Sequence, residues 1–194
     1  MRKLKFAWTV PNVLTLLRLL AIPFLCYLIW QWPEHRLKAF LLFLAIWLTD
    51  MLDGYIARHF NQMTAFGKLF DPLVDKLFQL ATAVTMFLIG RIPLWVPLFL
   101  FVRELLMVIG SLFLLRKRNQ VVYSSMIGKV ATFLFVVAFA ALFWVPSEPR
   151  IVRDLLFIPP VLCSFVATVF YASKNLFKRN TVIDEPLDEN APNA

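Results

Sequence analysis

The sequence predicts an all-α membrane protein in which six transmembrane helices form a compact bundle. First, 60% of the 194 residues are hydrophobic, and the mean hydropathy of +0.73 exceeds that of an ordinary water-soluble domain. Second, the apolar residues gather in segments of about 20 residues, the length that a helix needs to cross a bilayer. Third, the connectors between these segments are short, so consecutive helices would pack as antiparallel neighbours.

The predicted spans follow one another along the chain. They cover residues 11–31, 37–58, 69–90, 92–115, 126–145 and 154–173. Trp30, Trp32 and Pro33 would end the first span in the interfacial aromatic belt. The stretch 90–93, Gly-Arg-Ile-Pro, predicts a tight turn between the third and fourth spans. Four prolines frame the connection between the fifth and sixth spans: Pro146, Pro149, Pro159 and Pro160.

We expect one membrane domain over residues 1–179 and a disordered tail over 180–194, because the last residues are acidic and polar. The net charge is +8, from 20 basic and 12 acidic residues. No polar segment is long enough to fold a nucleic-acid-binding domain, so we expect no nucleic-acid partner. A basic excess in a membrane protein instead marks the loops on the cytoplasmic side.

The distribution of basic residues predicts the orientation of the spans. The richer side holds Arg2, Lys3, Lys5, Arg58, Lys68, Arg116, Lys117, Arg118, Lys174, Lys178 and Arg179. The other side holds Arg36, Lys38, Arg91, Arg150 and Arg153. The richer side should be cytoplasmic, which places both termini and the connection between the second and third spans in the cytoplasm. The expected location is the bacterial inner membrane.

Four aspartates lie at the predicted cytoplasmic ends of the second and third spans. Asp50 and Asp53 are spaced i, i+3, and Asp71 and Asp75 are spaced i, i+4, so each pair lies on one helix face. Charged side chains within a span are destabilising and therefore usually functional. Four converging carboxylates repel one another unless a cation compensates them. Hard oxygen ligands suit Mg²⁺ or Mn²⁺, and the sequence therefore predicts a divalent-metal site.

Two alternatives concern the aspartates themselves. They could pair with basic residues, or they could cap helices, and Asp71-Pro72 does have the composition of a helix start. Capping would account for one aspartate and not for four. A different class of function is a non-enzymatic cation carrier, but carriers usually place such groups at the bilayer midplane between repeats. A catalytically inactive scaffold is a third possibility.

The aspartates belong to a longer motif. Residues 50–58 read Asp-Met-Leu-Asp-Gly-Tyr-Ile-Ala-Arg, and after eight residues 67–75 read Gly-Lys-Leu-Phe-Asp-Pro-Leu-Val-Asp. This pattern resembles the signature of the CDP-alcohol phosphatidyltransferases, and every fixed position of the signature is present. The segment 11–18, Pro-Asn-Val-Leu-Thr-Leu-Leu-Arg, also resembles the start of the first span in that family.

The resemblance implies transfer of a phosphatidyl group from CDP-diacylglycerol to an alcohol, with release of CMP. It implies two metal ions, one held by Asp50, Asp53 and Asp71, and the second by Asp50, Asp71 and Asp75. Asp75 would also be the general base for the acceptor hydroxyl. The CDP-diacylglycerol site would include Asn12, Thr15, Gly54, Ala57, Arg58, Thr64 and Gly67. Relatives in the family are often homodimers.

The acceptor is predicted from the fourth and fifth spans. Their sequences are similar to those of phosphatidylglycerophosphate synthases, which accept glycerol 3-phosphate, and the acceptor phosphate would be held by Arg103, Lys129 and Arg116. For Arg116 we favour a cytoplasmic anchor, whereas Arg103 is equally consistent with an ion pair to Glu104 or another carboxylate. Glycerophosphate-using relatives often carry a second Arg where this chain has Ser111. Cardiolipin synthases of the same family, which accept phosphatidylglycerol, therefore remain an alternative.

Overall fold

The computed structural model of the chain describes residues 9–60, 65–118, 126–146 and 149–177. Within these ranges, the side chains at 57–58, 65–66, 68–69, 110–118, 126–127, 129 and 170–177 are not described. The described residues form six α-helices: α1 (Val10–Trp30), α2 (Arg36–His59), α3 (Ala65–Leu88), α4 (Trp95–Arg118), α5 (Met126–Leu142) and α6 (Arg150–Phe177). The predicted all-helical fold is confirmed, and the predicted tail lies outside the described residues.

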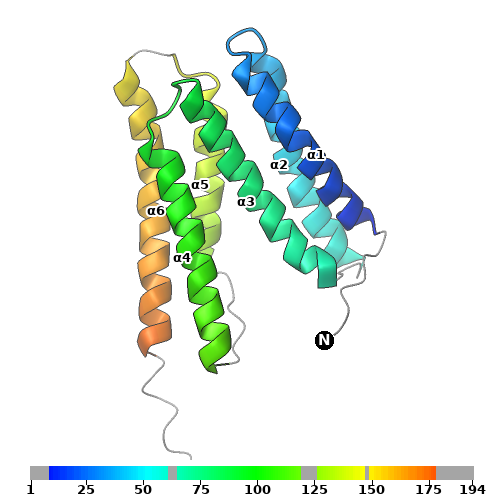
Figure 1. Cartoon of the computed structure of the whole chain (residues 1–194), viewed down its shortest axis with the longest axis vertical. Coiled ribbons are helices and arrows are strands. Elements are labelled where there is room, and N and C mark those ends of the chain that lie inside the picture. Colours follow the sequence, from blue (N-terminus) through cyan, green and yellow to red (C-terminus); the bar gives the residue numbers. More distant parts are fainter. Residues whose placement is uncertain (1–8, 61–64, 119–125, 147–148, 178–194) are drawn as a thin grey trace, which may run out of the picture.

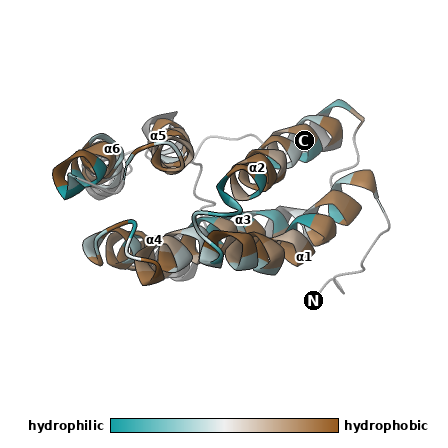
Figure 2. Cartoon of the chain, turned by 90° about the horizontal axis from the view of Figure 1, so that it is seen from above, coloured by the Kyte–Doolittle hydropathy of each residue, from teal (hydrophilic) through white to brown (hydrophobic). Residues whose placement is uncertain are grey.

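The helices pack in two layers that are visible from above (Figure 2). One layer contains α1, α3 and α4, in which α3 packs against both of its neighbours, and the other contains α2, α5 and α6. The closest packing partners are α5 with α6 and α1 with α2. In Figure 1, α1 begins and α6 ends at the same end of the bundle, as an even number of antiparallel helices requires.

The outer surface of the bundle is apolar, which identifies the chain as a membrane protein. Within the described ranges, three helical segments are long and apolar enough to cross a bilayer: Val10–Trp30, Arg36–Ile56 and Arg150–Val169. Large apolar side chains such as Leu20, at 68% exposure, point away from the neighbouring helices. In water such a surface would aggregate, whereas lipid chains can cover it. Charged residues within α3 and α4 lower their hydropathy, and α5 has 17 residues.

Two helix starts differ from the sequence prediction. The third helix begins at Ala65, so Asp71 and Pro72 lie inside α3 and do not start it. The sixth helix begins at Arg150 and continues through Pro159 and Pro160, which therefore do not frame a connection. Proline within a membrane helix is tolerated where neighbouring helices and local adjustments compensate the missing hydrogen bond. The predicted turn after α3 is confirmed, and Gly90 adopts a positive φ of 71° there.

An aromatic core joins the two layers. Phe43 of α2 lies 5.1 Å from Phe78 of α3 and 5.8 Å from Phe143, measured between ring centroids. Phe139 of α5 makes an edge contact with Phe157 of α6 at 5.2 Å. Both Phe139 and Phe157 are fully buried. Contacts of this kind between helices provide packing that the apolar exterior, solvated by lipid, cannot provide.

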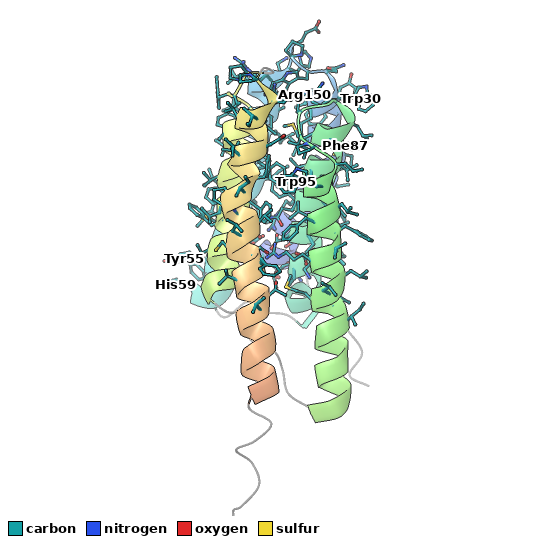
Figure 3. All side chains as sticks on the ribbon, turned by 90° about the vertical axis from the view of Figure 1, so that its left-hand side faces the viewer. Trp30, Tyr55, His59, Phe87, Trp95 and Arg150 are labelled. Carbon is teal, nitrogen blue, oxygen red and sulfur yellow. The ribbon has the colours of Figure 1, made fainter. Side chains whose placement is uncertain are left out.

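Two buried arginines close one end of the bundle, and we call them the arginine clasp. Arg91, after α3, donates hydrogen bonds from its Nη2 to the carbonyls of Leu142 (2.7 Å) and Val145 (2.5 Å). Arg153 of α6 donates to the carbonyls of Gly90 (2.9 Å) and Arg91 (3.1 Å). The clasp therefore ties the turn between α3 and α4 to the end of α5 and the start of α6. Figure 3 labels Trp30, Phe87 and Arg150 at this end.

Candidate active site

The site is built on α1 by three polar side chains that share one helix face. Asn12, Thr15 and Arg18 recur at intervals of three residues, which places them on adjacent turns. All three are buried, with relative exposures of 3%, 0% and 2%. An arginine buried within an otherwise apolar helix requires compensating acceptors. The faces of α2 and α3 that pack on α1 supply them.

The guanidinium of Arg18 is the centre of the site. Its Nη1 lies 2.5 Å from Oδ1 of Asp50 on α2 and 2.5 Å from Oδ1 of Asp75 on α3. Its Nη2 donates to Oδ2 of Asp53, which is itself buried. Because two carboxylate oxygens accept from the same nitrogen, Asp50 and Asp75 lie next to one another. The structure therefore brings the acidic faces of α2 and α3 together.

The fourth aspartate is held by a neutral group on α1. The hydroxyl of Thr15 donates to Oδ1 of Asp71 at 2.7 Å and also lies 3.0 Å from the carbonyl oxygen of Pro11. The two aspartates of α3 therefore contact consecutive turns of α1. Among the side chains that the structure describes, only Arg18 forms ion pairs with any of these aspartates, and it does so with three of the four, Asp50, Asp53 and Asp75. One guanidinium thus balances one of four negative charges.

The donor set fits a hard divalent cation, although the arrangement is centred on Arg18. Carboxylate oxygens from two helices are the ligands that Mg²⁺ and Mn²⁺ prefer, and the charge that Arg18 leaves uncompensated favours a further cation. Within the described part of the chain, however, no group of three or more His, Cys, Asp or Glu side chains is arranged as a metal site. The pairing with a basic residue, which the sequence left open as an alternative, is observed for Asp50, Asp53 and Asp75, and the metal site stays a prediction.

The other predicted site residues lie around this centre or outside the described residues. Gly54 follows Asp53 on α2 and is half-buried, and Gly67 lies in the first turn of α3 and is buried. Thr64 and the side chains of Ala57 and Arg58 lie outside the described residues. Tyr55 and His59, on the neighbouring face of α2, stack at a centroid distance of 5.5 Å. Figure 3 shows both toward the end of the bundle opposite the arginine clasp.

A second polar cluster connects α3, α4 and α5. Lys76, the residue after Asp75, places its Nζ 2.7 Å from Oε2 of Glu104. Arg103 has its Nη1 3.8 Å from Oε1 of Glu104 and its Nη2 3.5 Å from the hydroxyl of Thr132. The predicted pair between Arg103 and Glu104 is thus present but long. The side chains of Lys129 and Arg116, also predicted to hold the acceptor, lie outside the described residues.

Arg103 is buried with weak partners. Its side chain is 8% exposed, yet a guanidinium carries five N–H donors. Its contacts to Glu104 and Thr132 lie at or beyond the usual limit of a hydrogen bond. Arg103 also makes a weak cation–π contact to Phe135, at 5.9 Å. Among the described residues, Arg103 therefore has one hydrogen bond, at 3.5 Å, for its five donors.

Sequence reasoning missed two features of this site. The acidic motif does not predict the roles of Arg18 and Lys76, because neither residue belongs to it. A signal for Arg18 is present, since a lone arginine within an apolar segment must find acceptors on another helix. For Lys76 the signal is its place directly after Asp75, about 100° further around the same helix.

The fold and the site define a class of protein: a helical membrane protein in which polar groups from the first three helices converge inside the bundle. Residues 8–171 match the family model described as CDP-alcohol phosphatidyltransferase. The chain belongs to the CDP-alcohol phosphatidyltransferase family, and it is an enzyme of that class.

Relatives with three different names are similar to the chain. A CDP-diacylglycerol–glycerol-3-phosphate 3-phosphatidyltransferase of Aquifex aeolicus is 38% identical over 66% of this chain and 70% of its own length. A probable phosphatidylglycerophosphate synthase of Mycobacterium tuberculosis is 32% identical over 86% of this chain and 81% of its own length. A cardiolipin synthase (CMP-forming) of Streptomyces coelicolor is 33% identical over 69% of this chain, and the match spans 64% of that protein.

Proposed function

We propose that this chain transfers a phosphatidyl group from CDP-diacylglycerol to glycerol 3-phosphate, forming phosphatidylglycerophosphate and CMP. The observation that carries the proposal is the convergence of the four signature aspartates of α2 and α3 on one face of α1. A transfer between phosphates requires a site that gathers ligands for cations close to a bound diphosphate. The names of the relatives from Aquifex aeolicus and Mycobacterium tuberculosis support glycerol 3-phosphate as the acceptor.

We assign each of the four aspartates a role in the proposed reaction. Asp50, Asp53 and Asp71 would hold one Mg²⁺ or Mn²⁺ ion, and Asp50, Asp71 and Asp75 a second. Bound metal would neutralise the diphosphate and stabilise charge that develops on its oxygens. Asp75 is the most exposed partner of Arg18, at 45% of its side chain, and it would accept the proton of the acceptor hydroxyl.

The proposed nucleotide site lies on the small-residue face of α2. Gly54 would let the cytidine diphosphate approach the helix backbone, with Ala57 and Gly67 keeping the approach open. Arg58 would pair with a phosphate through its planar fork. Asn12, Thr15 and Thr64 would supply neutral polar contacts. In this arrangement all six helices span the inner membrane with both termini cytoplasmic, and the acyl chains of the substrate stay in the bilayer.

The proposed acceptor site is the cluster around Arg103. An acceptor with a phosphomonoester carries up to two negative charges and needs more than one cation. Arg103 is buried with unused donors, and Lys76 extends from the turn that carries Asp75, with 37% of its side chain exposed. A phosphate held by both cations would lie beside the proposed general base. Lys129 and Arg116 are further candidates at the same end of α4 and α5.

The second candidate function is cardiolipin synthesis, in which phosphatidylglycerol is the acceptor. The similarity to the Streptomyces coelicolor protein favours it. Phosphatidylglycerol presents a phosphodiester with one negative charge, so it would depend less on two cations. The two functions therefore differ in the demand that they place on Arg103 and Lys76.

The deciding experiment supplies the purified protein with CDP-diacylglycerol, Mg²⁺ or Mn²⁺, and one acceptor at a time. The acceptors are glycerol 3-phosphate, phosphatidylglycerol, inositol phosphate and serine, and the lipid product is identified by mass spectrometry. Phosphatidylglycerophosphate as the main product supports the proposal, and cardiolipin supports the second candidate. Absence of metal-dependent CMP release with every acceptor would overturn both and favour a cation carrier.

A further inference from the structure

Arg18 has no role in the chemistry proposed above, yet it makes the strongest polar contacts of the site. Its side chain is 1% exposed and touches three of the four aspartates. Such a group either forms an ion pair that only stabilises the fold or takes part in the binding of cations at the site. The positions of its two terminal nitrogens separate these possibilities.

The Nη1 nitrogen takes oxygens that a divalent ion would use. It contacts Oδ1 of Asp50 and Oδ1 of Asp75, one from each acidic helix. A metal ion that bridges α2 and α3 needs the same lone pairs at about 2.0–2.5 Å. The Nη2 nitrogen instead contacts Asp53, which is buried on the side of α2 nearer to α1. A carboxylate has about four lone-pair sites, so Asp53 can keep Arg18 and still offer its other oxygen.

We propose that Arg18 is a positioning residue that acts as an internal counter-cation: it holds the carboxylates together in the metal-free protein, and metal loading displaces Nη1 from Asp50 and Asp75. The contact from Nη2 to Asp53 persists and keeps α1 attached to α2. The inference rests on the proposed metal site at the four aspartates and is independent of the acceptor. Metal binding is thereby coupled to the position of α1.

The charge balance at the four aspartates predicts whether loss of Arg18 raises or lowers stability and metal binding. Among the described side chains one guanidinium offsets one of four carboxylates, and removal of it leaves the buried carboxylate of Asp53, at 3% exposure, without its partner, which is strongly destabilising. A divalent ion that binds the same oxygens removes this defect. Loss of Arg18 should therefore weaken the metal-free protein and strengthen its response to metal, whereas a purely structural arginine would lower stability equally in both states.

The test compares Arg18→Met with Arg153→Met as a matched control. Arg153 is similarly buried, at 5% exposure, but its guanidinium binds backbone carbonyls in the arginine clasp. Thermal unfolding in detergent is followed by the fluorescence of the six tryptophans, first after chelation and then with saturating Mn²⁺. We expect both variants to lose on the order of 10 °C without metal. Mn²⁺ should then raise the Tm of Arg18→Met by more than it raises the Tm of the wild type. The rise in the Tm of Arg153→Met should equal the rise in the wild type.

A direct binding measurement completes the test. The electron paramagnetic resonance signal of free Mn²⁺ gives its Kd. This Kd should be lower in Arg18→Met than in the wild type, by about fivefold or more. An equal or higher Kd in the variant would refute the proposal that Arg18 and the metal ion compete for the same carboxylate oxygens. An equal Mn²⁺ effect on the Tm of Arg18→Met and Arg153→Met would show that Arg18 is only structural. An unchanged metal-free Tm in Arg18→Met would refute its counter-cation role.

Two further variants keep the test decisive if Arg18→Met does not fold without metal. Arg18→Lys keeps the charge but reaches fewer oxygens, so its Kd for Mn²⁺ should lie below that of the wild type; an equal or higher value contradicts the proposal. The double variant Arg18→Met/Asp53→Asn removes one negative charge together with the positive one and should recover part of the lost metal-free Tm. No Mn²⁺ binding to the wild type would refute the proposed metal site, while the metal-free Tm values would still test Arg18.

Discussion

Substitution of Arg103 by methionine should weaken binding of the acceptor far more than it weakens the fold. Methionine keeps much of the volume and removes the charge. Within the protein, Arg103 makes an ion pair with Glu104 at 3.8 Å, a hydrogen bond to Thr132 at 3.5 Å and a cation–π contact with Phe135 at 5.9 Å. These three long interactions together contribute about 1 kcal/mol to stability. In the variant, Glu104 keeps its closer partner, Lys76, at 2.7 Å, so no buried carboxylate is left alone.

The expected loss of acceptor binding follows from the donors that Arg103 leaves unused. A charged hydrogen bond to a phosphate contributes about 1.5–3 kcal/mol, and about 1.4 kcal/mol corresponds to a factor of ten. The KM for glycerol 3-phosphate should therefore rise about 10- to 100-fold. The KM for CDP-diacylglycerol should stay unchanged, because Arg103 lies on α4 and the signature residues lie on α2 and α3.

The assay measures CMP release while each substrate is varied in turn, together with thermal unfolding of the same preparation. Arg153→Met serves as the control, since it removes a buried arginine at the clasp and should lower the Tm without changing either KM. A KM for glycerol 3-phosphate that stays the same in Arg103→Met would refute the acceptor assignment. A parallel rise of both KM values would refute the separation of the two substrates between the helices.

Three further predictions concern the first three helices. Asp75→Asn should lower kcat about 100-fold or more while thermal unfolding stays close to that of the wild type, because Arg18 keeps Asp50 and Asp53; retained turnover would contradict the general-base assignment. Gly54→Leu should raise the KM for CDP-diacylglycerol through bulk on α2, and Gly54→Ala should raise it less; an unchanged KM in the leucine variant would argue against nucleotide approach at this position. Chelation of divalent ions should abolish CMP release and added Mg²⁺ or Mn²⁺ should restore it, and release that continues in the chelator would exclude metal dependence.

The helices can be predicted from the sequence because their apolar segments are long and their connectors are short. The apolar pattern predicts a first span over 11–31, and α1 covers Val10–Trp30. The prediction is wrong where a local signal competes with packing. Asp71-Pro72 has the composition of a helix start, and Pro159 and Pro160 are expected to frame the connection before the sixth span. In each case the helix continues through the proline, because neighbouring helices and local adjustments compensate the hydrogen bond that proline removes.

The acidic motif predicts which carboxylates share a helix face, and the structure brings both faces together. The spacing within α2 and α3 cannot predict which helix packs against them or which group that helix presents. Arg18 lies 32 residues before Asp50 and 57 before Asp75 in the chain. The contacts of Arg18 depend on how α1 packs against α2 and α3. That packing cannot be predicted from the spacing of residues within one helix. The metal geometry and the roles of the individual site residues stay predictions.

The two polar clusters of the bundle meet on α3 and otherwise lie on different helices, and this has a consequence for how the acceptor can change. The aspartates and Arg18 occupy α1, α2 and α3, whereas Arg103 and Thr132 belong to α4 and α5, and the pair between Lys76 and Glu104 bridges the two groups. Activation of the CDP-diacylglycerol donor and choice of the acceptor alcohol would then depend on different groups of residues, which can change independently. Substitutions in the second half of the chain would then exchange one alcohol for another while the first half keeps its chemistry.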